Sequence, residues 1–149
     1  MKINAPITEI LRGKPSEVWT VTPDAAVFEA ISLMASKNIG AVPVVDGAEV
    51  IGVLSERDYT RKVALKGRSS RETKVREIMS SPAVTINLDA TVDCCMQMVT
   101  KKRVRHLPVL DGERLVGMIS IGDLVNWTIS AQNAALEQME SYIMGGYAV

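Results

Sequence analysis

The chain has 149 residues, 47% of them hydrophobic but only 4% aromatic, so any buried core must consist mainly of aliphatic side chains. Its 17 Lys and Arg balance its 17 Asp and Glu, so it has no overall field to attract nucleic acid, although a local basic patch is still compatible with this balance. No segment has the roughly 18 uninterrupted apolar residues of a membrane span, and the N-terminus lacks the apolar core of a signal peptide. We therefore expect a cytoplasmic protein.

The first predicted unit spans residues 18–66 and follows an N-terminal segment at 1–17. A short extended piece at 18–21 precedes a helix, whose start is predicted at Thr22-Pro23-Asp24 because this run offers a cap residue, a first-turn proline and an acid near the positive helix end. The helix should bury one stripe at helical spacing. This stripe consists of Val27, Ala30, Ile31 and Met34.

Two β-rich runs, "AVPVV" and "EVIGVL", complete this unit together with a second helix. Asp46-Gly47 between the runs is a typical hairpin turn signal. The second helix is predicted to begin at Ser55. The unit therefore has the order β-α-β-β-α, which predicts an α/β fold.

The same unit is repeated 65 residues later. "VPVVDGAEVIGVLSERD" at 42–58 aligns without a gap with "LPVLDGERLVGMISIGD" at 107–123, and "TVTPDAAV" at 20–27 aligns with "TINLDATV" at 85–92. This alignment indicates an internal duplication whose second copy spans 83–128. Since about 60 residues rarely support a core alone, we expect the two copies to pack face to face.

The only two cysteines, Cys94 and Cys95, are adjacent in the first helix of the second copy. Neighbouring cysteines rarely form a disulfide, and the chain has no second pair to complete a zinc site. The predicted buried stripe of this helix explains them without chemistry. It consists of Val92, Cys95, Met96 and Val99.

Two further segments lie outside the copies. The connector at 67–82 is polar, with one predicted helical turn around Val75 and Ile78. The tail at 129–149 continues a helix predicted to end at Gly145-Gly146. It carries apolar residues at heptad spacing, an arrangement equally consistent with packing on its own body and with a dimer contact. These residues are Ile129, Leu136 and Ile143, with Met139 between them.

Each copy contains Gly, two apolar residues, Ser, two further residues and Asp. The simplest interpretation of Ser55 with Asp58, and of Ser120 with Asp123, is a helix capping box. The alternative is a ligand site, because a helix start offers free amides to a phosphate and a carboxylate one turn later can accept bonds from ribose hydroxyls. Basic residues near both motifs favour a phosphorylated ligand. They are Arg57, Arg61 and Lys62 in the first copy, and Arg103, Arg105 and His106 in the second.

No residue pattern suggests catalysis. His106 is the only histidine, and no nucleophile, paired carboxylate or metal-ligand cluster accompanies it in the sequence. We therefore predict that the chain is not an enzyme and binds no metal.

The duplicated unit, the runs "IMSSPAVTI", "AVPVVDG" and "HLPVLDG", and the two Gly-x-x-Ser-x-x-Asp motifs together resemble a tandem pair of CBS domains, also called a Bateman module. The resemblance covers Ile7 to about Val125. It implies two intertwined halves with pseudo-twofold symmetry and two clefts that bind adenine nucleotides. Ligands of the family include AMP, ADP, ATP, S-adenosylmethionine and NAD(H), and its members often form dimers.

The resemblance also implies roles for individual positions. Asp58 and Asp123 would hold ribose hydroxyls, while Ser55 and Ser120 would lie beside phosphate, with Arg57 and Arg61 nearby. The backbone that reads the adenine edge would be that of Thr20, Val21, Thr85 and Ile86. The strand before each proline would hold adenine and phosphate through Ala41, Val42, Arg105, His106 and Leu107. The copies differ at these positions, so the two clefts are expected to hold different ligands, for example a mononucleotide and a dinucleotide such as NAD.

The resemblance thus predicts a stand-alone, non-catalytic sensor of adenine nucleotides that signals to an unknown effector protein by a conformational or dimer change. Two alternatives remain open from the sequence. One is a structural dimerisation module whose clefts are vestigial. The other, less favoured, is a nucleic-acid-associated protein that uses the basic stretch 62–76, which lacks interleaved aromatic residues.

Overall fold

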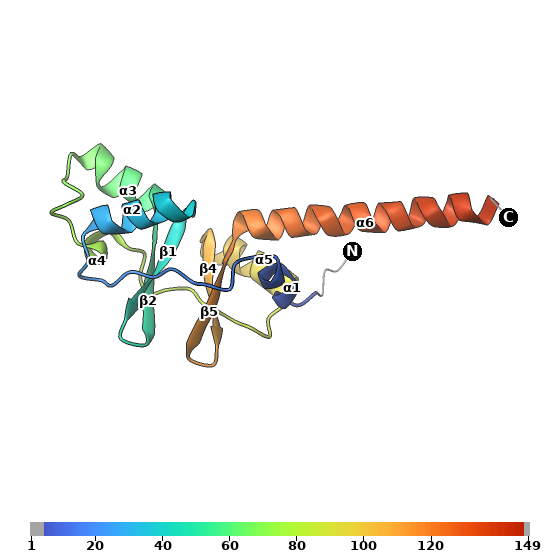
Figure 1. Ribbon diagram of the computed structural model, residues 1–149, viewed down its shortest axis with the longest axis horizontal. Coiled ribbons are helices and arrows are strands. Elements are labelled where there is room, and N and C mark those ends of the chain that lie inside the picture. The colour runs from blue at the N-terminus through green and yellow to red at the C-terminus, as the bar shows by residue number, and fades with distance from the viewer. Residues whose placement is uncertain (1–4, 148–149) are drawn as a thin grey trace.

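The structure is a computed structural model that describes residues 5–147. It shows two similar α/β halves side by side, from which one long helix projects (Figure 1). The first half contains the helices α2 (Val27–Lys37), α3 (Glu56–Lys62) and α4 (Val75–Ile78), the short 3-10 helix η1 (Ala64–Lys66), and the strands β1 (Ala41–Asp46) and β2 (Glu49–Ser55). The second half contains the helices α1 (Thr8–Arg12), α5 (Val92–Lys102) and α6 (Ile121–Tyr147), and the strands β3 (Ile86–Asn87), β4 (His106–Asp111) and β5 (Arg114–Ser120).

The two hairpins follow the predicted duplication closely. β1 pairs antiparallel with β2, and β4 pairs antiparallel with β5, each with a register shift at the same place in the copy. The turns contain Gly47 at φ 63° and Gly112 at φ 64°, a left-handed conformation that glycine adopts without strain. In the second half β3 adds a parallel strand, whereas in the first half the equivalent segment makes only an isolated bridge from Val21 to Val44.

The predicted start of the first helix at Thr22-Pro23-Asp24 is wrong, because α2 begins at Val27. The connector supplies the reason. The Val27 amide donates to the Thr73 carbonyl at 2.8 Å, and the Phe28 amide donates to the Ser70 carbonyl at 2.9 Å. Backbone carbonyls from a distant segment therefore satisfy the free amides of this helix end in place of a local side-chain cap.

The predicted buried stripes are confirmed in both helices. Val27, Ala30 and Met34 lie in the core of the first half, and Ile31 packs against it. Val92, Cys95 and Val99 lie in the core of the second half, with Met96 packed against it. Burial raises the pKa of the Cys95 thiol to about 12, with a smaller contribution from Cys94, so this thiol remains protonated and packs as an apolar group.

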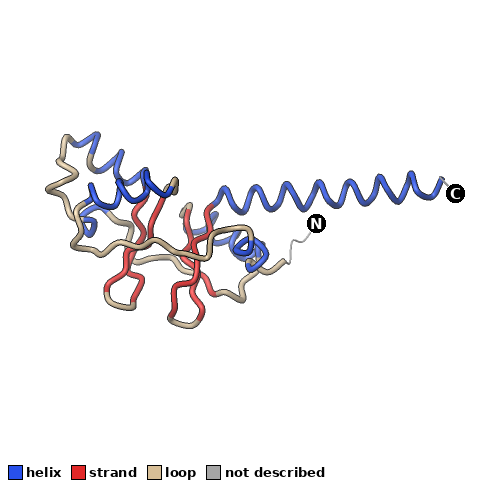
Figure 2. The backbone as a smooth tube through the Cα atoms, viewed as in Figure 1, coloured by secondary structure: helices blue, strands red, loops and turns tan. Residues whose placement is uncertain are grey.

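Each half is completed by a segment that lies outside its own copy of the repeat. Ile7 and Ile10, at α1, lie in the core of the second half, although the segment 1–17 precedes the first copy. Val75 and Ile78, at α4, lie in the core of the first half. Figure 2 shows the loops that run between the halves to make these exchanges. The halves are therefore intertwined, and neither the N-terminal segment nor the connector is an independent unit.

The C-terminal tail is not separate from the second copy. α6 runs without a break from Ile121 to Tyr147 and includes Gly145-Gly146, where the sequence predicted the helix end. Its first turns pack on the body through Leu124, which is fully buried, and through Trp127. Beyond these turns the helix projects from the body (Figure 1). Among the helices of residues 5–147, none is long and apolar enough to span a membrane.

Candidate functional site

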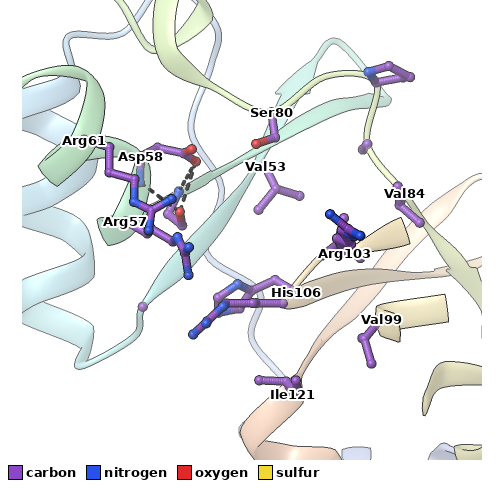
Figure 3. A pocket seen from close by; sticks show the side chains of 16 residues that line it. Val53, Arg57, Asp58, Arg61, Ser80, Val84, Val99, Arg103, His106 and Ile121 are labelled. Atoms are coloured by element: carbon purple, nitrogen blue, oxygen red, sulfur yellow. Dashed lines mark hydrogen bonds between the residues drawn. The ribbon is translucent and has the colours of Figure 1, made fainter. Parts of the chain in front are cut away.

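A first cavity of about 640 Å³ lies between the two halves and contains the Ser55 and Asp58 motif. Both halves contribute walls. Arg57, Asp58 and Arg61 come from α3, and they face His106 and Arg103 across the space (Figure 3). The apolar part of the wall includes Val53, Val84, Val99, Val104 and Ile121.

The capping box predicted at Ser55 is confirmed. The Ser55 hydroxyl accepts from the Asp58 amide at 3.1 Å, and Asp58 Oδ2 accepts from the Ser55 amide at 3.0 Å. The other carboxylate oxygen, Oδ1, lies 3.3 Å from the Lys62 ammonium. The same carboxylate also lines the first cavity, so the structural and the ligand-binding interpretations are compatible.

Four guanidinium groups give the first cavity its charge. Arg57, Arg61, Arg103 and Arg105 all line it, and none of them forms an ion pair with a residue between 5 and 147. Mainly the charge of Arg61, and then that of Arg105, lowers the pKa of Arg57 from its ordinary value. The groups therefore repel one another, and a polyanion in the cavity would relieve this repulsion.

Arg103 has an unusual backbone. It caps α5 in the left-handed conformation at φ 53°, and its counterpart in the first half, Asn38, caps α2 at φ 54°. Asparagine tolerates this conformation, whereas for arginine it is strained. The side chain of this strained residue lines the first cavity, and strained backbone of this kind is commonly found at functional sites.

A second cavity of about 420 Å³ contains the other motif, Ser120 and Asp123. Here the carboxylate of Asp123 already has hydrogen-bond partners within the chain. Asp123 Oδ2 accepts from the Ser120 amide at 2.9 Å and from the Lys14 ammonium at 2.6 Å. Burial raises the pKa of Asp123, but the Lys14 hydrogen bond, the Ser120 amide and the Lys14 charge together lower it below its ordinary value. Trp19 lines the same cavity, with the Lys37 ammonium 4.1 Å from its ring centre.

The two cavities meet at His106 and Gly40, which line both. Burial is the main cause that lowers the pKa of His106, followed by the positive charge of Lys14. A neutral imidazole therefore forms part of the shared wall.

Comparison with known proteins identifies the family. The sequence matches the CBS domain over residues 14–65 and 75–130. CBS domain-containing protein CBSX3, mitochondrial, from Arabidopsis thaliana is 36% identical over 151 residues, which cover 95% of this chain and 73% of that protein. A CBS-domain protein structure from Burkholderia ambifaria superposes with a TM-score of 0.80 and 47% identity, covering 86% of this chain and 96% of that chain. A hexameric CBS-CP12 protein from bloom-forming cyanobacteria gives a TM-score of 0.74 and 29% identity, covering 83% of this chain and 68% of that chain.

The chain belongs to the CBS-domain family. The predicted fold, two β-α-β-β-α repeats packed as a CBS pair, is confirmed. Such a pair is generally a regulatory module.

The CBS pair brings some of the predicted ligand residues to the cavities. Those at the first cavity are Ser55, Arg57, Asp58, Arg61, Arg105 and His106. Those at the second are Ala41, His106, Ser120 and Asp123. Their assignment to a ligand stays a prediction.

Other predicted ligand residues lie elsewhere. Val42 and Leu107 are fully buried and Ile86 is 7% exposed, because the inner face of each sheet points into the core of its half. The side chains of Val42 and Leu107 are therefore corrected from ligand contacts to core residues, whereas the prediction for Ile86 concerns its backbone and stays a prediction. Thr85 lines a separate hollow at the hairpin tips. Thr20 is exposed and Val21 is partly buried, and neither lines the first or the second cavity.

The site prediction also omitted residues that line the cavities of the CBS pair. Lys14 and Trp19 line the second cavity, and Arg103, predicted from the sequence only as a basic residue near the second motif, lines the first. One signal for Lys14 is present in the sequence: "ITEIL" at 7–11 matches "VREIM" at 75–79 with a shift of 68 residues rather than 65. An alignment without gaps cannot show this part of the duplication.

Proposed function

We propose that this CBS pair is a non-catalytic sensor that binds an adenine nucleotide with two or three phosphates, ADP or ATP, in the first cavity. The observation that carries the proposal is the set of four unpaired guanidinium groups beside the Asp58 carboxylate. Arginine binds phosphate oxygens in a bidentate manner, and a carboxylate can accept two bonds from the vicinal hydroxyls of ribose.

The distribution of groups fits the parts of such a ligand. Val53, Val84 and Val99 offer an apolar surface to a base, and Asp58 offers its carboxylate between that surface and the arginines of α3. AMP would engage fewer of the guanidinium groups than ATP. We therefore expect affinity to rise from AMP through ADP to ATP, with NAD(H) as a further candidate because its pyrophosphate carries two charges.

Calorimetric titration with AMP, ADP, ATP and NAD tests this proposal. ATP should bind, and Asp58→Ala should weaken binding at least tenfold, as expected when an acceptor for two hydrogen bonds is lost. Because Asp58 also caps α3, the matched control is Glu77→Ala. Glu77 accepts from the Lys74 amide at 2.7 Å at the start of α4 and lies outside the first cavity.

The control separates ligand contact from folding. Glu77→Ala should lower the melting temperature of the first half without changing ATP affinity. If Asp58→Ala binds ATP as tightly as the unmodified protein, the ribose assignment is wrong. If no adenine nucleotide binds the unmodified protein at millimolar concentration, the sensor proposal fails.

The exposed face of α6 supports a second element of the proposal, a homodimer. Val125, Ile129, Leu136, Met139 and Ile143 lie along one helical seam and are between 44% and 61% exposed. Exposed apolar residues at this spacing are typical of a helix that pairs with another. We infer that the partner is α6 of a second copy in an antiparallel orientation.

The sequence of α6 favours this orientation. Antiparallel pairing centred on Gln132 places Val125 opposite Met139, and brings Ile129 close to Leu136. It also places Glu137 and Glu140, the only charged residues after Asp123, opposite uncharged residues of the partner. A parallel pair would instead place each glutamate beside its own copy, and like charges at such close range repel.

Light scattering after size exclusion tests the dimer. Leu136→Asp should convert a dimer to a monomer, whereas Ala134→Asp, which puts the same charge on the opposite side of the helix, should leave the dimer intact. If both variants remain dimeric, another surface holds the copies together. A dimer that persists while no nucleotide binds would favour the structural dimerisation module over the sensor.

A further inference from the structure

We propose that Lys14 closes the second cavity to ribose, so that each chain binds one nucleotide, in the first cavity, and none in the second. This inference deepens the proposed function, since it concerns the number and the place of the ligands. It rests on the position of one ammonium group relative to the two duplicated carboxylates.

Lys14 occupies the hydrogen-bonding site that a ribose would need. Its ammonium donates to Asp123 Oδ2 at 2.6 Å and to the Met118 carbonyl at 2.6 Å. The ion pair is partly shielded from water, since the Lys14 and Asp123 side chains are 32% and 25% exposed. A sugar that needs both carboxylate oxygens of Asp123 can bind only after this pair has been broken.

The first cavity lacks this lysine, and the pseudosymmetry explains why. Leu11 lies against Gly117 just as Met79 lies against Gly52, so residues 7–14 in the second half correspond to 75–82 in the first. Lys14 therefore corresponds to Pro82, which lines the first cavity without a charge. Asp58 Oδ2 accepts only from the Ser55 amide and hydroxyl of the cap, and the one ion pair of Asp58 among residues 5–147 is with Lys62 of its own helix, at the longer distance of 3.3 Å.

The charges of the second cavity agree with this assignment. Lys14 and Lys37 are balanced by Glu17 and Asp123, and no arginine lines this cavity. The first cavity has four arginines against Asp58. A nucleoside phosphate therefore finds no net attraction in the second cavity, while its ribose finds the carboxylate already bound.

The experiment uses two probes in calorimetric titrations of the full chain. Titration with ATP gives the number of binding sites in the unmodified protein, and we expect one site per chain. Adenosine has a ribose but no phosphate. Titration with adenosine tests the second cavity in an Asp58→Ala background, where binding to the first cavity is weakened. In that background adenosine should not bind measurably, and adding Lys14→Met should create one site per chain.

Two controls establish where the new site lies. Lys37→Met removes the other ammonium of the second cavity, which stacks on Trp19 rather than on Asp123, and should create no site. Adding Asp123→Ala to the Lys14→Met variant should abolish the new site. Circular dichroism melting confirms that each variant is folded at the titration temperature.

The outcomes separate this inference from the proposed function. Two ATP sites per chain in the unmodified protein, or no gain of adenosine binding with Lys14→Met in a folded variant, would overturn the role of Lys14. Failure of ATP to bind the unmodified protein would overturn the nucleotide sensor and the site in the first cavity but not the role of Lys14, because the gain of a ribose site by Lys14→Met would still be measurable with adenosine.

Discussion

The two cavities are built on the same duplicated motif but have opposite chemistry. In the first, Asp58 faces a space bordered by four unpaired arginines. In the second, Asp123 is bound to Lys14, and no arginine lines the space. The motif is a helix cap in both, while the residues around it give the two cavities different charges. The residues that differ, not the repeated ones, therefore distinguish the two cavities.

The largest expected effect concerns the arginines of the first cavity. Replacing Arg57 and Arg61 together with alanine removes two of the proposed phosphate-binding groups, and each is expected to contribute roughly tenfold or more in affinity. We expect ATP affinity to fall at least a hundredfold and AMP affinity to fall less, because AMP has fewer phosphates to lose contact with. Titration at two salt concentrations measures both effects. Equal losses for AMP and ATP would contradict the placement of the β and γ phosphates near α3.

A second comparison concerns the packing of Gly52 and Gly117, which occupy equivalent positions in the two repeats. A Cβ at Gly52 would lie 2.7 Å from the Ser80 carbonyl oxygen, which belongs to the backbone. A Cβ at Gly117 would lie 2.7 Å from a terminal methyl of Leu11, which can rotate away. Both contacts come from segments outside the repeat copy of the glycine, but only the connector presents backbone to it.

Alanine at these two positions should therefore have unequal costs. Gly52→Ala should lower the free energy of unfolding by about 2 kcal/mol, within the range for overpacking, and Gly117→Ala by less than about 1 kcal/mol. Urea unfolding of both variants tests the difference. Equal destabilisation would show that α1 is held as rigidly as the connector.

The sequence predicted the parts of the fold that depend on local patterns. The helix stripes, the hairpins and the cap at Ser55 follow from the spacing of apolar residues and from turn residues, and the structure confirms them. The start of α2 could not be predicted, because the carbonyls of Thr73 and Ser70 that cap it come from a distant segment. The contact of Lys14 with Asp123 could not be predicted for the same reason, since the segment before the first copy completes the second half.

The strained cap at Arg103 offers a third way to compare the halves. Arg103→Asn gives α5 the residue that caps α2, and should raise the free energy of unfolding by about 1 kcal/mol by relieving left-handed strain. It should also lower ATP affinity severalfold, because one guanidinium of the first cavity is lost. If Arg103→Asn raises the free energy of unfolding and lowers ATP affinity, Arg103 contributes to ligand binding and destabilises the fold. A gain in stability with unchanged ATP affinity would exclude Arg103 from the site.

The smallest expected effect concerns His106, which separates the two cavities. Because burial lowers its pKa in the folded chain, the unfolded chain takes up a proton first as the pH falls below about 6.5. The free energy of unfolding should therefore decrease by a fraction of a kcal/mol between about pH 7 and pH 5, and this decrease should be smaller in His106→Gln. Urea unfolding at several pH values measures it.

The same imidazole reports on the occupancy of the first cavity. Lys14 and Arg105 lower its pKa, while Asp123 and Asp58 raise it, so an added phosphate charge in the first cavity should raise the pKa further toward its ordinary value. His106 is the only histidine in the chain, so its proton resonances can be followed by NMR without assignment of others. If ATP raises the pKa of His106 and adenosine does not, the phosphates lie beside the wall that the two cavities share. No shift with bound ATP would place them away from His106, at the Arg61 end of the cavity.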